Sequence, residues 1–117
     1  MGDRINFYFK QDDISPTVKL YSHSGGFYAK EKLSAALLHA KPRWNDPEYG
    51  TRMIINHIIG DYTMGELGYG ISAEKPGYFR AEENGYYIID FQNKAVQFVG
   101  PYGDYSESTF EYFTNSF

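Results

Sequence analysis

Residues 41–52, KPRWNDPEYGTR, bring together residue types that bind anions. Arg43 and Arg52 can each offer a planar fork of N–H donors to a phosphate or carboxylate. Trp44, the only tryptophan, can stack on a flat ring such as a nucleobase, and Asn45 adds an amide beside it. A proline in the same segment marks a helix start, whose free N–H groups also attract an anion. The segment therefore predicts a site for a small phosphorylated ligand.

The same segment also has a purely structural interpretation. Trp44 can fill the core between two helices, and Asp46 can cap the second helix. The two arginines can then pair with nearby carboxylates, namely Glu48, Asp61 or Glu66. A single tryptophan lies in a core more often than it forms a ligand platform. The sequence leaves both interpretations of Trp44 open.

No recognised catalytic or metal-binding pattern occurs in the sequence. The three histidines, His23, His39 and His57, fit no ligand spacing, and the absence of cysteine excludes disulfides and thiolate sites. There is no Gly-x-Ser-x-Gly motif, and the paired carboxylates at 12–13 and 82–83 fall in expected turns. We therefore expect no enzyme activity, no metal and no cofactor. An enzyme would need His23 or His57 beside a carboxylate in a cleft.

Composition and charge limit the class of protein. A chain of 117 residues has the usual size of one domain, so residues 1–117 are expected to form a single unit. The net charge of −4 argues against general nucleic-acid binding, which depends on many cationic contacts. No apolar run is long enough to cross a membrane. The twelve tyrosines could line a core, a binding groove or an oligomer interface.

Hydrophobic periodicity predicts the first half of the fold. Alternating apolar residues within residues 4–23 predict an antiparallel hairpin. Apolar residues then recur at helical spacing over residues 27–40. A second helix is expected to begin at Asn45 or Asp46, either of which can cap it, and to end at Gly60.

The second half is predicted to return to strands. They are expected at residues 67–73, 86–91 and 95–99, the last two as a hairpin. Ser108 and Glu111 resemble a capping box, which favours a short C-terminal helix, although a strand fits the same residues. The order ββααβββ predicts an α+β fold, in which two helices pack on one face of a mostly antiparallel sheet of about five strands.

Three blocks of the sequence resemble a group of small tailed-bacteriophage proteins of unassigned activity. The blocks are MGDRINF, PRWNDPEYGTRMIINHIIGD and GELGYGIS, in a fixed order over the first two thirds of the chain. The shared patterns are MGDR-x-NF, RWNDP-x-Y-x-TR and GYGIS. This chain departs from the group at Ser22 and Ser24, where relatives carry glycine and an aromatic residue, and at Leu67, where they carry threonine. The resemblance implies a phage product that acts in the host bacterial cytoplasm.

For such a product the resemblance implies a non-enzymatic protein that counters host defence. The expected role is to sequester a small phosphorylated ligand, such as a cyclic nucleotide immune signal, as a homo-oligomer. Arg4 and Tyr69 are expected to join Arg43, Trp44 and Arg52 in the pocket. The alternative is a protein–protein inhibitor of a host defence factor or an accessory virion protein, which would use exposed tyrosines on one sheet face.

Overall fold

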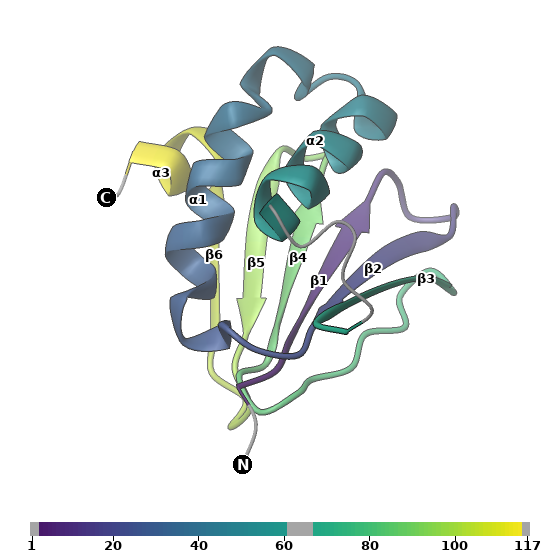
Figure 1. The fold of residues 1–117 in the computed structure, drawn as a ribbon. Coiled ribbons are helices and arrows are strands. Elements are labelled where there is room, and N and C mark those ends of the chain that lie inside the picture. Colours follow the sequence, from purple (N-terminus) through teal and green to yellow (C-terminus); the bar gives the residue numbers. More distant parts are fainter. Residues whose placement is uncertain (1–2, 61–66, 116–117) are drawn as a thin grey trace.

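A mixed β-sheet forms the centre of the protein (Figure 1). The computed structural model describes residues 3–60 and 67–115. Its strands are β1 (Ile5–Lys10), β2 (Thr17–Ser22), β3 (Tyr69–Glu74), β4 (Tyr86–Asp90), β5 (Ala95–Val99) and β6 (Tyr105–Thr109). Among the described residues they form one 6-stranded sheet in the order β3-β2-β1-β4-β5-β6. All neighbouring strands are antiparallel except β1 and β4, which are parallel.

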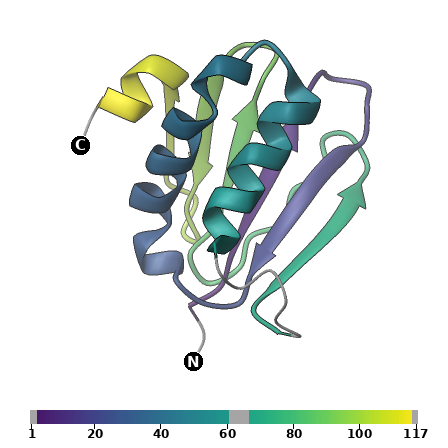
Figure 2. The same ribbon diagram turned by 45° about the horizontal axis from the view of Figure 1, so that its top comes forward.

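The helices lie together on one face of this sheet (Figures 1 and 2). They are α1 (Ala29–His39), α2 (Pro47–Ile59) and α3 (Phe110–Asn115), with short 3-10 turns at Gly26–Tyr28 and Lys41–Arg43. In both views α1 lies beside α2 on one side and α3 on the other. The predicted α+β class, with the two longer helices on one face of a mostly antiparallel sheet, is confirmed.

The core lies between this helical layer and the sheet. Ile5, Phe7 and Phe9 alternate along β1 and are at most 3% exposed, because they point toward the helices. Leu37 and Ile54 meet them from α1 and α2 and are fully buried. The apolar residues that recur every second position in β1 and at helical spacing in α1 and α2 therefore form the two sides of one core.

The face of β1 that points away from the helices is covered as well. Asn6 and Tyr8 are also buried there, at 1% and 0% exposure. The connection between β3 and β4 crosses this face, where Phe79 packs edge-on against Tyr8 at 5.0 Å between ring centroids. The backbone N–H of Arg80 donates to the Tyr8 hydroxyl at 2.9 Å. A central strand covered on both faces explains why Tyr8 is one of the most buried tyrosines.

The C-terminal segment corrects the predicted strand count. The sequence left a strand or a helix open for this segment, and the structure contains both, β6 followed directly by α3. The capping residue is Thr109, whose hydroxyl accepts a hydrogen bond from the backbone N–H of Tyr112 at 3.1 Å. Ser108, the cap expected from the sequence, lies in β6 instead. The predicted cap of α2 is correct, because the Asp46 side chain accepts from the Tyr49 N–H.

Candidate functional site

Two predicted site residues, Arg43 and Arg52, lie beside Tyr49 at the start of α2. Tyr49 was not predicted as a site residue. The guanidinium carbons of Arg43 and Arg52 lie 5.1 and 5.9 Å from the ring centroid of Tyr49, within the range of cation–π contacts. Tyr49 is 52% exposed, and both arginines are exposed. Arg43 also lies 3.7 Å from the carboxylate of Asp46. Asn45 is exposed in the adjoining turn.

Trp44, predicted either as a stacking platform or as a core residue, does not belong to this exposed group. The side chain is only 7% exposed and packs edge-on against Phe110 at 5.2 Å between ring centroids. Its indole N–H donates to the backbone carbonyl of Leu37 at 2.9 Å. The geometry therefore favours the structural interpretation of Trp44, because most of its ring is packed in the core and its N–H group is already bound.

Arg4 and Tyr69 lie at the other end of the sheet from Arg43. Ile5, next to Arg4, pairs with Ser22, and Ser22 pairs with Tyr69, so these residues share one end of three strands. The Tyr69 hydroxyl donates to the carbonyl of Ile58 in the last turn of α2. The length of α2, roughly 1.5 Å per residue over about twelve residues, separates this end from Arg43. The structure therefore does not bring Arg4 and Tyr69 together with Arg43 in one pocket.

Arg4 has a local partner at its own end of the sheet. Its Nε donates to Glu83 at 2.7 Å, and its backbone N–H donates to the same carboxylate at 3.0 Å. The Arg4 guanidinium holds the pKa of Glu83 at about 2, first through the side-chain hydrogen bond. An arginine bound in this way ties the start of β1 to the 82–83 turn. The predicted ion pairs of the arginines with Asp61 and Glu66 lie outside the described residues.

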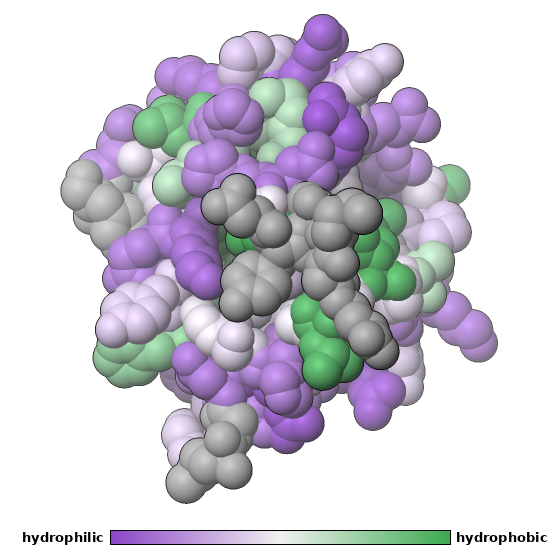
Figure 3. All heavy atoms as spheres, in the orientation of Figure 1, coloured by the Kyte–Doolittle hydropathy of each residue, from purple (hydrophilic) through white to green (hydrophobic). Residues whose placement is uncertain are grey.

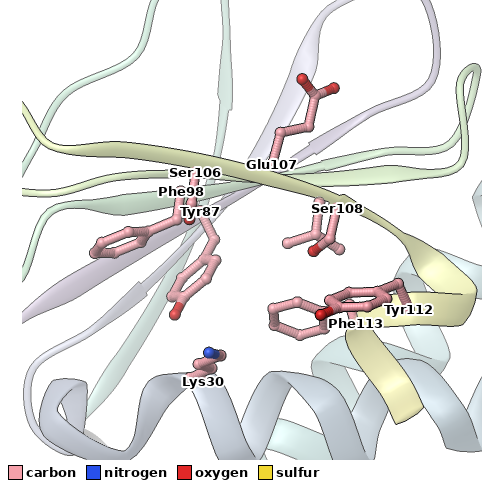
Figure 4. Close-up of a pocket in the computed structure, with 9 residues that line it drawn as sticks. Lys30, Tyr87, Phe98, Ser106, Glu107, Ser108, Tyr112 and Phe113 are labelled. Carbon is pink, nitrogen blue, oxygen red and sulfur yellow. The ribbon is translucent and has the colours of Figure 1, made fainter. Parts of the chain in front are cut away.

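A cleft between α1, β6 and α3 was not predicted from the sequence (Figure 4). Its volume is about 410 Å³. The lining residues are Lys30, Tyr87, Val96, Phe98, Ser106, Glu107, Ser108, Tyr112 and Phe113. In Figure 4 the Glu107 carboxylate points to the far side of β6, so its charge does not face the cavity. We call this cavity the α1–β6 cleft.

The floor and walls of the α1–β6 cleft are aromatic. The Tyr87 ring lies 4.7 Å from the Phe98 ring and 6.2 Å from the Phe113 ring, measured between centroids. Ser106 and Ser108 stand opposite Phe98 and Val96 in the β5–β6 register, so both side chains face the helices. Serines fill little space, and β6 lies at the edge of the sheet. The hollow therefore exists because small residues face the helical layer where larger ones would close it.

The polar groups of the α1–β6 cleft are chiefly hydrogen-bond donors. Tyr87 is 6% exposed, and its hydroxyl points toward Lys30 in Figure 4. Burial raises the pKa of Tyr87, and the charge of Glu31 raises it further. The cleft thus presents the Lys30 side chain, the phenols of Tyr87 and Tyr112 and two serine hydroxyls beside aromatic rings.

No family model, curated protein or solved structure matches the chain. The resemblance to tailed-bacteriophage proteins therefore stays a prediction. Within residues 3–60 and 67–115, no helix is long and apolar enough to cross a membrane.

Over the same ranges, no group of three or more His, Cys, Asp or Glu residues could hold a metal ion. His23 accepts or donates a hydrogen bond with the Tyr21 hydroxyl at 2.7 Å, and the His39 and His57 rings lie 5.2 Å apart. None of these histidines lines the α1–β6 cleft. The cleft can hold an anion and stack a flat ring.

The sequence did contain one signal for the cleft. Ser106 and Ser108 alternate in a segment whose neighbours are mostly large, which in a strand places two small hydroxyl residues on one face. This signal depends on assigning a strand at the C-terminal segment, where a helix was favoured. Lys30 carried no signal, because a lysine on a helix usually faces solvent.

Proposed function

We propose that the protein is a non-enzymatic binding protein that sequesters a small phosphorylated ligand in the α1–β6 cleft. The observation that carries the proposal is the combination of an ammonium group and four hydroxyls with aromatic walls in one cavity of about 410 Å³. Together with the resemblance to phage proteins, it supports a role in which a cyclic nucleotide immune signal is withdrawn from a defence system in the host bacterial cytoplasm.

The size and the lining of the cleft both suit this class of ligand. Small-molecule pockets usually measure about 300–1,000 Å³, with apolar walls and a few convergent polar groups. Tyr87, Phe98 and Phe113 offer rings on which a nucleobase can stack. Lys30 can bind a phosphate as a point charge, and Ser106 and Ser108 can donate hydrogen bonds to its oxygens.

The exposed group around Tyr49 supports the same ligand less well. The Arg43 guanidinium already lies beside the Asp46 carboxylate, which offsets its charge. Both arginines are exposed, so salt screens their attraction for a phosphate. We therefore place the phosphorylated ligand in the α1–β6 cleft and treat Arg43 and Arg52 as the competing location.

A thermal-shift and calorimetry screen tests the proposal. The ligands are cyclic dinucleotides, mononucleotides, ADP-ribose derivatives and inorganic phosphate at one salt concentration. A ligand at about 100 times its Kd should stabilise the fold by about 2.7 kcal/mol. No response to any of these ligands would overturn the proposal.

Matched variants then locate the binding site. Lys30→Ala should weaken binding by about tenfold or more, since a hydrogen bond to a charged group contributes about 1.5–3 kcal/mol. Lys32→Ala is the control, because Lys32 lies on the same helix with its ammonium beside Gly25. Binding that survives Lys30→Ala but is lost in the Arg43→Ala/Arg52→Ala double variant would place the ligand at Tyr49 instead.

Exposed tyrosines favour a protein partner as the second candidate function. Among the described residues, those at least half exposed are Tyr28, Tyr49, Tyr78, Tyr102, Tyr105 and Tyr112. They come from different elements, and only Tyr105 lies in a strand, so they do not form the expected patch on one sheet face. On the face shown in Figure 3, hydrophobic residues occur in separate places among hydrophilic ones. A protein inhibitor therefore remains the alternative to ligand sequestration.

A further inference from the structure

The strand β3 forms one edge of the sheet, beyond β2. Such an edge presents a row of backbone donors and acceptors that another strand can bind. Its middle residues, Ile71, Ser72 and Ala73, are exposed, and the Ile71 side chain is 60% exposed. This edge is at the opposite end of the strand order from β6 and the α1–β6 cleft. Association with another chain at β3 would therefore be independent of ligand binding in the cleft.

The pairing of β3 with β2 fixes which backbone groups point outward. The His23 N–H donates to the Gly68 carbonyl at 2.8 Å, which makes these two residues a hydrogen-bonded pair. Hydrogen-bonded and non-hydrogen-bonded pairs alternate along an antiparallel ladder. Ser72, opposite Lys19, therefore directs its backbone groups toward β2. Ile71 and Ala73 direct theirs outward, where no described residue binds them.

The exposed part of β3 lacks the devices that protect sheet edges. Proteins place proline, charged side chains or bulges on edge strands to prevent pairing with another chain. Residues 69–73, YGISA, contain no proline and no charge. Glu74 follows them, and its carboxylate lies 3.5 Å from the Lys19 ammonium and accepts from Ser72. The nearest charge is therefore already neutralised within the chain.

The other edge of the sheet carries the protection that β3 lacks. The Gly100 N–H donates to the Asp104 carbonyl, which makes these two residues a hydrogen-bonded pair. Because such pairs alternate along the β5–β6 ladder, the backbone N–H and C=O of Glu107 point away from β5. Glu107 is the middle residue of β6, Tyr105–Thr109. Its carboxylate places a charge in the middle of this edge, which opposes pairing with another strand. The two edges thus differ in their suitability for self-association.

We propose that β3 is a homodimer interface, at which it pairs antiparallel with β3 of a second copy about a two-fold axis at Ser72. In this register Ile71 of each copy lies opposite Ala73 of the other copy, and the two residues exchange both of their backbone hydrogen bonds. Ser72 faces Ser72 of the second copy at the axis, where the non-hydrogen-bonded spacing is closest and suits a small side chain. Glu74 falls opposite Gly70, so no like charges meet.

The β3 edge is complementary to itself, so we infer that its partner is β3 of a second copy of the chain. A two-fold interface requires one surface to fit itself, and the exposed Ile71–Ser72–Ala73 triplet does so through backbone groups, one hydroxyl residue and two apolar side chains. The dimer would be one continuous sheet with the helices of each copy on its own half. Both α1–β6 clefts would stay open at the outer ends.

Sedimentation velocity over a wide concentration range tests this interface. The wild-type chain should dimerise, and Ile71→Lys should raise the dimer Kd by at least about tenfold, because it places a charge on the edge. Ile14→Lys is the matched control, since Ile14 is 86% exposed in the β1–β2 loop and lies outside the strands. A wild-type chain that stays monomeric, or an Ile71→Lys variant that dimerises as well as wild type, overturns the proposal.

Hydrogen exchange of the wild-type chain gives a readout that needs no variant. The outward amides of Ile71 and Ala73 should gain protection as the protein is concentrated, whereas the outward amide of Glu107 should not. A dimer in which the Ile71 and Ala73 amides exchange like exposed amides would have another interface and would overturn the proposal. Ligand binding in the α1–β6 cleft is measured separately, so either result leaves the test of that site intact.

Discussion

The indole N–H of Trp44 donates a hydrogen bond to the backbone carbonyl of Leu37 at 2.9 Å. Leu37 lies in the last turn of α1, and its carbonyl also accepts a hydrogen bond from the backbone N–H of Ala40 at 3.2 Å. Trp44 thus ties the end of α1 to the turn that leads into α2, and its ring fills the space beside Phe110. This one contact explains why the tryptophan of a cation-rich loop is buried.

Replacing Trp44 should destabilise the fold strongly. Trp44→Ala is expected to lower the free energy of unfolding by about 3–5 kcal/mol, the usual loss for a buried aromatic residue. Trp44→Phe should cost less, since it keeps part of the packing and loses the hydrogen bond. Urea denaturation gives the values, with Tyr49→Ala as the control on an exposed aromatic residue of the same region. A loss below about 1 kcal/mol for Trp44→Ala would contradict the buried role.

Gly50 offers a test of close packing within α2. A Cβ atom at this position would lie 2.8 Å from Cε1 of Phe91 and 2.9 Å from the carbonyl oxygen of Arg43. Alanine should gain about 1 kcal/mol of helix propensity, but overpacking usually costs about 1–3 kcal/mol. We expect Gly50→Ala to be destabilising, because the Arg43 oxygen belongs to the backbone and accepts from the Asp46 N–H.

The control for this substitution is Gly70→Ala in β3. There the nearest atom to an added Cβ is Cβ of Tyr21 at 4.0 Å, an ordinary contact. Thermal or urea unfolding should show little change for Gly70→Ala and a clear loss for Gly50→Ala. A stabilised Gly50→Ala variant would mean that the Arg43 turn can shift away at little cost.

The Arg4–Glu83 pair should make stability depend on pH in the acid range. The pKa of Glu83 is lowered from 4.5 to about 2 in the folded protein. Its contribution is therefore complete above the unfolded value, near pH 4.5, and is lost as the pH falls toward 2. Urea denaturation at several pH values should show that Glu83→Gln is less stable than wild type at pH 7 and that the difference shrinks in this window.

Glu82→Gln is the matched control for this pH dependence. The Glu82 carboxylate approaches Arg4 only to 3.8 Å, without the hydrogen bonds that Glu83 accepts. Its removal should leave most of the acid dependence in place. An equal effect of both variants would show that the net charge of the turn matters and that the specific Arg4–Glu83 contact does not.

Tyr87→Phe should separate ligand binding from stability. Tyr87→Phe keeps the ring contacts with Phe98 and Phe113 and removes only the hydroxyl, so it should change the free energy of unfolding by less than about 1 kcal/mol. A ligand that accepts from this hydroxyl should bind about 5- to 10-fold more weakly, the effect of one net hydrogen bond. Calorimetry with the ligand found in the screen measures the change. Unchanged affinity would place the ligand elsewhere in the cleft or outside it.

The sequence alone determined the elements whose signals are local. The proline and capping carboxylate at the start of α2, the alternation along β1 and β2, and the turn between β4 and β5 depend on neighbouring residues only. The α+β class followed from their order. These features were predictable because capping, periodicity and turn chemistry are properties of short segments.

Only the tertiary structure decided where the site residues meet. Arg4 and Arg43 carry the same chemistry in the sequence, but the strand register and the length of α2 place them at opposite ends of the sheet. Trp44 became a core residue because Phe110, far along the chain, packs against it. The α1–β6 cleft joins Lys30 to residues 87–113, a contact between distant segments. Long-range packing creates such sites, and no local pattern encodes it.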